Sequence, residues 1–320
     1  MRVLMFGRGV IATLYGHVLE AAGHEVHFYV RPGRAAEYGD DVGMDLIDAR
    51  RRPGAQRVRA TIPLRLRESV DPADGFDLVV LSVAHYRLAE AAAFLAPRIG
   101  DATVLVFGNV WQEPLTAVAP LPADRVVFGF PMGGGGFSED GVVHGGLLRS
   151  VIIGRAGTSP NPREAAVADL FRSTGLSVRE EADMRGWLFI HFLSDAGMFA
   201  QGVQSGGLAG MIGNRRALRA ALETGRELIP VLRSRGVDLS RHRTALIPFR
   251  MPAPVAAAIA LATTLFPIAR ESLAAHTDPH SPEALAILHD TLGEARRFDI
   301  PAPRLEAAVR ELPSDLRATS

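Results

Sequence analysis

The sequence contains neither cysteine nor lysine. The absence of cysteine excludes disulfide bonds, thiolate catalysis and cysteine-ligated zinc sites. All 35 basic residues are therefore arginine. An arginine side chain stays charged and does not release its proton near neutral pH. A reaction that needs a proton donor must take it from another residue type.

The chain also lacks net charge and long uninterrupted apolar runs. Its 35 basic and 35 acidic residues balance, and 48% of residues are hydrophobic, which predicts a globular protein without general attraction to nucleic acid. Three prolines interrupt the most apolar stretch, Met251–Ile268, which favours a buried helix over a membrane span. The first strand begins at the start of the chain, so we expect no signal peptide and a cytoplasmic location.

The stretch Met1–Arg34 has the pattern of a dinucleotide-binding unit. An apolar strand is predicted at Arg2–Phe6, followed by a helix that runs to Ala22 and ends at Gly23. A second strand is predicted at Glu25–Val30. A strand, a glycine turn, a helix and a strand within about thirty residues form this unit.

The turn itself supplies the groups that a dinucleotide needs, and it reads Gly7-Arg8-Gly9-Val10-Ile11-Ala12. Gly7 permits the tight turn, and Gly9 lets the backbone approach a pyrophosphate closely. Ala12 replaces the third glycine of the motif and keeps the helix close to the strand. The pyrophosphate then lies against free N–H groups at the helix N-terminus.

The residues after the second strand indicate which dinucleotide binds. An NAD site usually carries an acidic residue there, which accepts hydrogen bonds from the ribose 2′-hydroxyl. This chain has Arg31 and Arg34 instead. A guanidinium can bind a 2′-phosphate with paired hydrogen bonds, so the sequence predicts NADP(H). The alternative is that Arg31 only solvates the end of a strand.

Further strands and helices continue the α/β pattern to about residue 180. The predicted strands are an edge hairpin of Met44–Asp48 and Arg57–Ile62, then Asp77–Ala84, Thr103–Phe107, Arg125–Phe130, Gly141–His144, Leu148–Gly154 and Leu176–Arg179. Helices are predicted at Tyr86–Ile99 and Pro162–Ser173. The glycine tract Pro131–Gly136 is predicted to bend close to the nicotinamide or the substrate.

Two polar residues follow strands of this sheet. His85 comes after the strand at Asp77–Ala84, and Asn109 comes after Thr103–Phe107. Ligands of open parallel sheets bind outside the carboxyl ends of the strands, so both residues are predicted to face the cofactor crevice. The alternative for each is a turn or cap residue.

Beyond residue 180 the chain reads almost entirely as helices. They are predicted at Trp187–Gln201, Arg215–Arg235, Pro254–Ser272, Ser281–Phe298 and Pro303–Glu311. We therefore predict a Rossmann-type α/β domain at residues 1–180 and an all-α domain at residues 181–320, with the active site between them.

At this point the sequence resembles the ketopantoate reductase (2-dehydropantoate 2-reductase) family over nearly its whole length. The resemblance rests on the glycine turn with Arg31, on the helix that opens with Trp187, and on the segments DLVVLSVAHYRL, VLVFGNV, FGFPMGGGG…DGVVHGG and SPEALAIL…DIPAP. It implies a C-terminal domain similar to that of 6-phosphogluconate dehydrogenase and NADPH-dependent reduction of a 2-oxo acid. It also implies an interdomain site with an asparagine at the position of Asn109, a glutamate at that of Glu283 and a serine near Ser272. We further predict that Val83, His85 and Gly134 bind the cofactor.

The chain departs from this family where relatives carry lysine, at His85 and in the helix that opens the second domain. That helix normally presents lysine and two asparagines on one face. One register places Phe189, Leu193 and Gly197 there, and the other places Trp187, His191 and Asp195. We favour the second register because a polar pair in an apolar helix needs a reason to exist. His191 is then the general acid and Asp195 orients it, the alternative being a satisfied core pair.

Other interpretations of the chain remain open. His276, Asp278, His280 and His289 suggest a metal cluster, but their loose spacing favours a polar loop and we predict no metal. The function can also be imine (C=N) reduction in a biosynthetic pathway, or NADPH binding by an inactive sensor or scaffold. The sequence predicts a small-molecule substrate, no nucleic-acid or membrane partner, and a monomer or homodimer.

Overall fold

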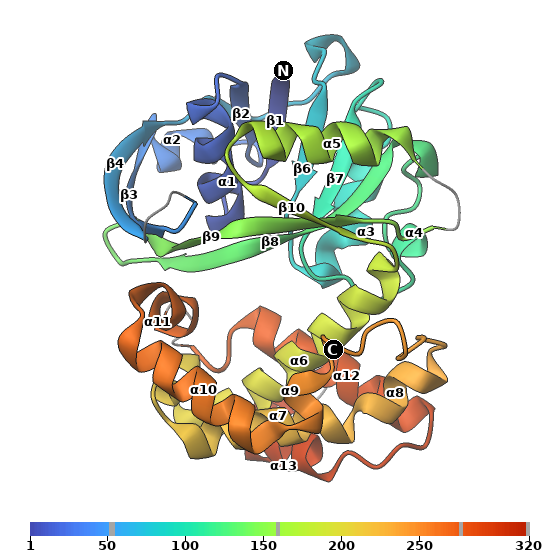
Figure 1. Ribbon diagram of the computed structural model, residues 1–320. Helices are drawn as coiled ribbons and strands as arrows, with labels where there is room; N and C mark the ends of the chain where they lie inside the picture. The colour runs from blue at the N-terminus through green and yellow to red at the C-terminus, as the bar shows by residue number, and fades with distance from the viewer. Residues whose placement is uncertain (51–54, 158–160, 275–277, 318–320) are drawn as a thin grey trace. The chain divides into compact units, whose positions relative to one another are not determined.

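The computed structural model describes residues 1–50, 55–157, 161–274 and 278–317 (Figure 1). The chain forms two compact units, Met1–Arg185 and Gly186–Ser320. The first unit is an α/β Rossmann-like unit and the second is helical, which confirms the predicted fold class. The domain boundary predicted after residue 180 stays a prediction.

The described strands of the first unit form one ten-stranded sheet in the order β4-β3-β9-β8-β7-β6-β1-β2-β5, with β10 paired to β9. The strands are β1 Arg2–Phe6, β2 Glu25–Tyr29, β3 Asp41–Asp48, β4 Gln56–Pro63, β5 Leu66–Arg67, β6 Leu78–Leu81, β7 Thr103–Phe107, β8 Val126–Phe137, β9 Val143–Gly154 and β10 Ser177–Glu181. The central strands β2, β1, β6, β7 and β8 are parallel. Because both faces of these strands are buried, β6 is an uninterrupted apolar run and β7 is apolar after Thr103.

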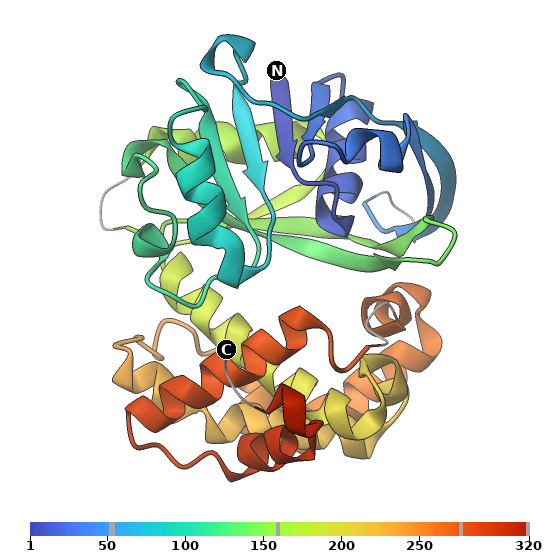
Figure 2. The same cartoon turned by 180° about the vertical axis from the view of Figure 1, so that it is seen from behind.

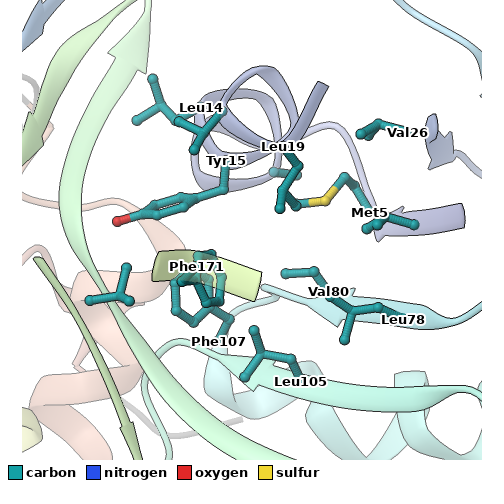
Figure 3. Packing of buried hydrophobic residues seen from close by; sticks show 14 of the residues in the cluster. Met5, Leu14, Tyr15, Leu19, Val26, Leu78, Val80, Leu105, Phe107 and Phe171 are labelled. Carbon is teal, nitrogen blue, oxygen red and sulfur yellow. The ribbon is translucent and has the colours of Figure 1, made fainter. Parts of the chain in front are cut away.

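Helices cover both faces of this sheet. They are α1 Val10–Ala21, α2 Ala35–Tyr38, α3 Leu88–Leu95, α4 Pro114–Ala117 and α5 Pro162–Ser173, with short 3₁₀ turns η1 Pro72–Asp74, η2 His85–Arg87 and η3 Ala123–Arg125. Helices α1 and α5 lie in front of the sheet in Figure 1, and α3 lies in front in Figure 2. In the core between α1, α5 and the sheet, Tyr15 packs edge-on against Phe107 at 4.8 Å between ring centroids and against Phe171 at 6.1 Å (Figure 3).

The glycine tract is part of a long hairpin, so the bend predicted at Pro131–Gly136 is wrong. Strand β8 continues through the tract to Phe137, with a register shift between Pro131 and Gly133. The two strands predicted at Gly141–His144 and Leu148–Gly154 are a single strand, β9, antiparallel to β8 and parallel to β3.

Paired glycines explain why this hairpin forms. Gly135 lies opposite Gly145 across the two strands. A Cβ atom on Gly135 would collide with the carbonyl oxygen of His144, and one on Gly145 would collide with that of Gly134. The strands therefore approach more closely than any side chain permits. Glycine serves close backbone pairing here rather than a turn.

The second unit contains α6 Met184–Ser205 from Gly186 onward, α7 Arg215–Glu227, α8 Ile229–Ser234, α9 Ile247–Arg250, α10 Pro252–Leu265, α11 Pro267–Ala274, α12 Pro282–Arg297 and α13 Pro303–Glu311, with 3₁₀ turns η4 Leu208–Met211 and η5 Ser314–Leu316. Two long helices predicted from the sequence are each divided. The stretch Arg215–Arg235 breaks at Leu228, with Pro230 in the first turn of α8. The stretch Pro254–Ser272 breaks before Pro267, where α10 and α11 are bent by 101°. Proline lacks an N–H donor and therefore starts a new helix at each position.

The described helices were compared with the length and hydrophobicity that a membrane-spanning helix needs. No single one is long and apolar enough to cross a membrane, although α10 and α11 pass as a bent pair by length and composition.

A buried ion pair crosses the core of the helical unit. The guanidinium carbon of Arg235 lies 3.7 Å from the ring centroid of Phe189 in α6. Its Nε lies 3.4 Å from a carboxylate oxygen of Glu294 in α12, and the two side chains are 7% and 16% exposed. The end of α8 is thus joined to both α6 and α12.

Candidate functional site

The glycine turn after β1 has the backbone geometry of a phosphate-binding loop. Gly7 adopts a φ of +106°, which favours glycine, and its N–H donates to the carbonyl oxygen of Tyr29 at 3.0 Å. Gly9 is the N-cap of α1, whose first turn holds no acidic residue. The first helical hydrogen bond runs from Thr13 N–H to Gly9, so the preceding N–H groups lie outside the helical ladder. Space above Gly7 and Gly9 is open, because a Cβ on either meets nothing within 4 Å.

A pocket of about 210 Å³ opens beside this turn. It brings together five of the predicted cofactor residues, Gly7, Arg8, Arg31, Arg34 and Val83. They come from the glycine turn, from the loop after β2 and from the segment after β6. The other predicted cofactor residues lie outside this lining: Gly9, Val10, Ile11, Ala12, His85, Asn109 and Gly134.

Aromatic side chains that the sequence analysis did not identify also line the pocket. The Tyr29 ring lies 4.9 Å from the ring of Phe6 and 4.9 Å from that of Phe94, measured between centroids. Phe6 and Tyr29 end their strands immediately beside the glycine turn and Val30. Their place at the carboxyl ends of adjacent parallel strands was a sequence signal for ligand contact. Phe94 and Tyr38 carried no such signal.

The pocket lining carries more arginine charges than carboxylate charges. Arg34 pairs with Glu37 at 3.0 Å, and the Arg87 guanidinium pairs with Glu90 at 3.1 Å. Among the described residues, neither Arg8 nor Arg31 has a carboxylate partner.

Arg8 is also partly removed from water. Its side chain is half-buried, and its Nε is buried without a hydrogen-bond partner among the described residues. Burial lowers the pKa of its guanidinium. A desolvated cation without an anionic partner is unfavourable. Such a group favours an anionic ligand in this pocket.

Glu68 fixes the loop that carries Arg31 and Arg34. Its carboxylate accepts a hydrogen bond from the N–H of Ala35 at 2.8 Å. Backbone hydrogen bonds from Ala35, Gly33 and Arg34 lower the pKa of the Glu68 carboxyl group. The loop is therefore held by an ionised side chain from the segment after β5.

In the helical unit, Trp187, His191 and Asp195 follow one another along one side of α6, and we call them the polar row. The Trp187 and His191 rings are 5.1 Å apart between centroids and inclined by 8°. His191 Nε2 lies 3.5 Å from Asp195 Oδ2, and the two side chains are 30% and 24% exposed. The pair is accordingly not enclosed in the core. Phe189 and Leu193, which belong to the other register, are fully buried. The assignment of His191 and Asp195 to catalysis stays a prediction.

Two serines of the helical unit form local hydrogen bonds. Ser281 caps α12 by accepting a hydrogen bond from Ala284 N–H at 3.4 Å, and Glu283 lies exposed in the first turn of that helix. The hydroxyl of Ser272 donates to the carbonyl oxygen of Ala269 at 2.8 Å. His289 Nε2 lies 2.8 Å from the carbonyl oxygen of Leu316.

No metal site is evident in the part of the chain that the structure describes. It contains no group of three or more His, Cys, Asp or Glu residues that could hold a metal ion. His276 of the proposed cluster lies outside the described residues.

A larger cavity, of about 580 Å³, lies in the helical unit but contains none of the predicted site residues. Its Glu223 carboxylate is bound by Arg219 and by Arg304, each at 2.8 Å. The smaller pocket beside the glycine turn has phosphate-binding backbone geometry and two arginines, Arg8 and Arg31, that pair with no carboxylate of the described ranges. We therefore take the smaller pocket as the candidate site.

Comparison with known proteins identifies a matching family model and a related protein. Residues 3–157 match the model of the family described as Ketopantoate reductase PanE/ApbA. The chain is 29% identical over 244 residues to a 2-dehydropantoate 2-reductase of Halobacterium salinarum, covering 75% of this chain and 78% of that relative.

Solved structures share the fold. The 2-dehydropantoate 2-reductase of Geobacter metallireducens matches with a TM-score of 0.66 and 17% identity, over 98% of this chain and 99% of that one. A D-mandelate dehydrogenase in complex with NADH and anilino(oxo)acetate matches with a TM-score of 0.71 and 15% identity, over 97% of each chain.

Proposed function

We propose that the chain, whose residues 3–157 match the family model described as Ketopantoate reductase PanE/ApbA, is an NADPH-dependent reductase of a 2-oxo acid. The relatives support this reaction class, because they are named as a 2-dehydropantoate reductase and a D-mandelate dehydrogenase. The observation that carries the proposal is the pocket beside the glycine turn, where Arg8 and Arg31 have no carboxylate partner among the described residues.

The residues of the first unit fit NADPH. The open space over Gly7 and Gly9, with the N-terminus of α1 behind it, suits a pyrophosphate. Arg31 and Arg34 suit the 2′-phosphate, which an acidic residue would repel. We assign Val83, His85, Asn109 and Gly134 to further cofactor contacts, of which the family resemblance implies Asn109.

The proposed chemistry uses the polar row of α6. When bound, NADPH supplies a hydride to the carbonyl carbon of the substrate. The carbonyl oxygen then needs a proton, and the chain has no lysine to donate it. His191 donates this proton, Asp195 orients the imidazole, and Asn109 acts as a neutral hydrogen-bond donor. Glu283 and Ser272 bind the substrate.

A substrate panel tests the proposal. NADPH consumption is measured with 2-dehydropantoate, phenylglyoxylate, other 2-oxo acids and cyclic imines. We expect turnover of 2-oxo acids. Turnover of imines alone would identify an imine reductase. NADPH binding without turnover of either class would identify an inactive sensor or scaffold. We also infer a monomer or homodimer, which light scattering measures.

Replacing Arg31 with alanine is expected to weaken NADPH far more than NADH. The lost charged hydrogen bond corresponds to about 1.5–3 kcal/mol of NADPH binding free energy. Dissociation constants of both cofactors are measured by fluorescence titration. Arg59→Ala, on the exposed edge of β4, is the control and should change neither value. Equal losses for both cofactors would contradict the 2′-phosphate assignment.

Replacing Glu283 with glutamine is expected to raise KM or lower kcat at least tenfold. The melting temperature should change little, because Ser281 provides the side-chain cap of α12. Glu306→Gln, in the first turn of α13, is the matched control for charge at a helix N-terminus. A large fall in melting temperature with normal kinetics would make Glu283 a structural residue only.

A further inference from the structure

Four side chains from three segments stack into a column at the edge of the cofactor pocket. The guanidinium carbon of Arg8 lies 4.8 Å from the ring centroid of Tyr38 and 4.9 Å from that of Phe137. The guanidinium carbon of Arg34 lies 5.3 Å from the Tyr38 ring. Arg34 also donates a hydrogen bond to the Tyr38 hydroxyl at 3.3 Å. The column joins the glycine turn, α2 and the end of β8.

The column explains how the desolvated Arg8 persists although no carboxylate in the described part of the chain pairs with it. The faces of aromatic rings attract a guanidinium electrostatically, and this attraction grows when water is excluded. Tyr38 and Phe137 provide two such faces for Arg8, whereas most other arginines of this unit pair with acids. Stacking uses the faces of the guanidinium and leaves the donors at its edge for a ligand.

Phe137 has a second feature that needs explanation. It ends β8 on the hairpin and is 38% exposed, although it is a large apolar residue. Its contact with Arg8 accounts for an aromatic ring at this position. Tyr38, the last residue of the four-residue helix α2, touches both Arg8 and Arg34 and so sets the positions of two guanidinium groups at once.

We propose that Tyr38 and Phe137 determine cofactor specificity by holding Arg8 as a further 2′-phosphate ligand beside Arg31 and Arg34. The inference rests on the proposed use of NADPH. Tyr38 and Phe137 are positioning residues, and Arg8 is the group that contacts the phosphate. Discrimination between NADPH and NADH then depends on the β8–β9 hairpin as well as on the loop after β2.

The test uses the full chain and two nucleotides that differ only in the 2′-phosphate, 2′,5′-ADP and 5′-AMP. Dissociation constants are measured by calorimetry. Arg8→Leu is expected to weaken 2′,5′-ADP at least tenfold and to leave 5′-AMP within twofold. Tyr38→Leu and Phe137→Leu should each weaken 2′,5′-ADP about fivefold with the same selectivity. Tyr38→Phe keeps the ring and should lose less than Tyr38→Leu.

A matched control separates this effect from general loss of an aromatic side chain. Phe298→Leu removes a ring that stacks under Arg297 in the helical unit, at 4.6 Å, and should change neither constant. Melting temperatures confirm that each variant is folded.

Each outcome of the titrations decides the proposal. Equal weakening of both nucleotides by Arg8→Leu would assign Arg8 to another phosphate and overturn it. Unchanged 2′,5′-ADP binding in the Tyr38 and Phe137 variants would also overturn it, while leaving the proposed function intact. A wild-type chain that binds both nucleotides equally would overturn the inference together with the NADPH preference.

Discussion

Replacing His191 with asparagine is expected to lower kcat about a hundredfold or more, because hydride delivery to a carbonyl leaves an alkoxide that needs a proton. A positioned acid contributes about 10²–10⁴ in rate. Asparagine retains a hydrogen-bond donor but cannot release a proton near neutral pH. His191 is partly exposed, stacks on Trp187 and has Asp195 3.5 Å away. It can therefore reach a substrate and be held in one orientation.

The pH dependence of kcat distinguishes this role from a structural one. The wild-type profile should have a limb in which the rate falls with rising pH, and the variant should lack this limb. Asp195→Asn should retain the limb with a smaller loss of rate. His24→Asn, at the far end of α1, is the control and should behave as wild type. Unchanged turnover with an intact profile would leave proton donation to water or to the substrate itself.

Replacing Arg235 with methionine is expected to reduce the free energy of unfolding by about 3 kcal/mol. Methionine keeps most of the side-chain volume but leaves the Glu294 carboxylate in a largely buried position. Arg297 also lies 3.1 Å from Glu294 and compensates part of that charge. The stacking of Arg235 on Phe189 is lost as well. Urea denaturation measures the change.

Two further variants test whether the loss of stability in Arg235→Met comes from the buried ion pair. Arg241→Met removes a solvent-exposed partner of Asp238 and should cost less than about 1 kcal/mol. Combining Arg235→Met with Glu294→Met removes both charges and should recover part of the lost stability. A loss in Arg235→Met no larger than in Arg241→Met would show that the buried pair contributes little.

Sequence alone predicted the elements whose ends carry clear local signals. Helix α5 begins at Pro162 after the cap Asn161, as predicted, and α13 begins at Pro303. Strand β7 is an apolar run with the predicted bounds. Prediction failed where a distant partner decided the outcome. The glycine tract of β8 became a strand because β9 pairs with it. No local pattern reports such a partner.

In the candidate site, too, residues with a local sequence signal were predicted and residues brought together only by the fold were not. The glycine turn and Arg31 were predicted because the motif and its spacing are local in sequence. Tyr38 and Phe137 were not predicted, since one ends a four-residue helix and the other meets Arg8 from a distant strand. That no acidic residue in the described part of the chain pairs with Arg8 is likewise visible only in three dimensions, because a sequence does not show which charges meet.

The glycine pair of the β8–β9 hairpin limits how this chain can evolve. A side chain on Gly135 or on Gly145 meets the backbone of the opposite strand, not a side chain that could shrink in response. Compensation usually works by making a neighbouring residue smaller, and here the neighbour is already the smallest residue. No substitution at the facing glycine can therefore make room for a side chain at either position. Only a change in strand pairing itself could accommodate it.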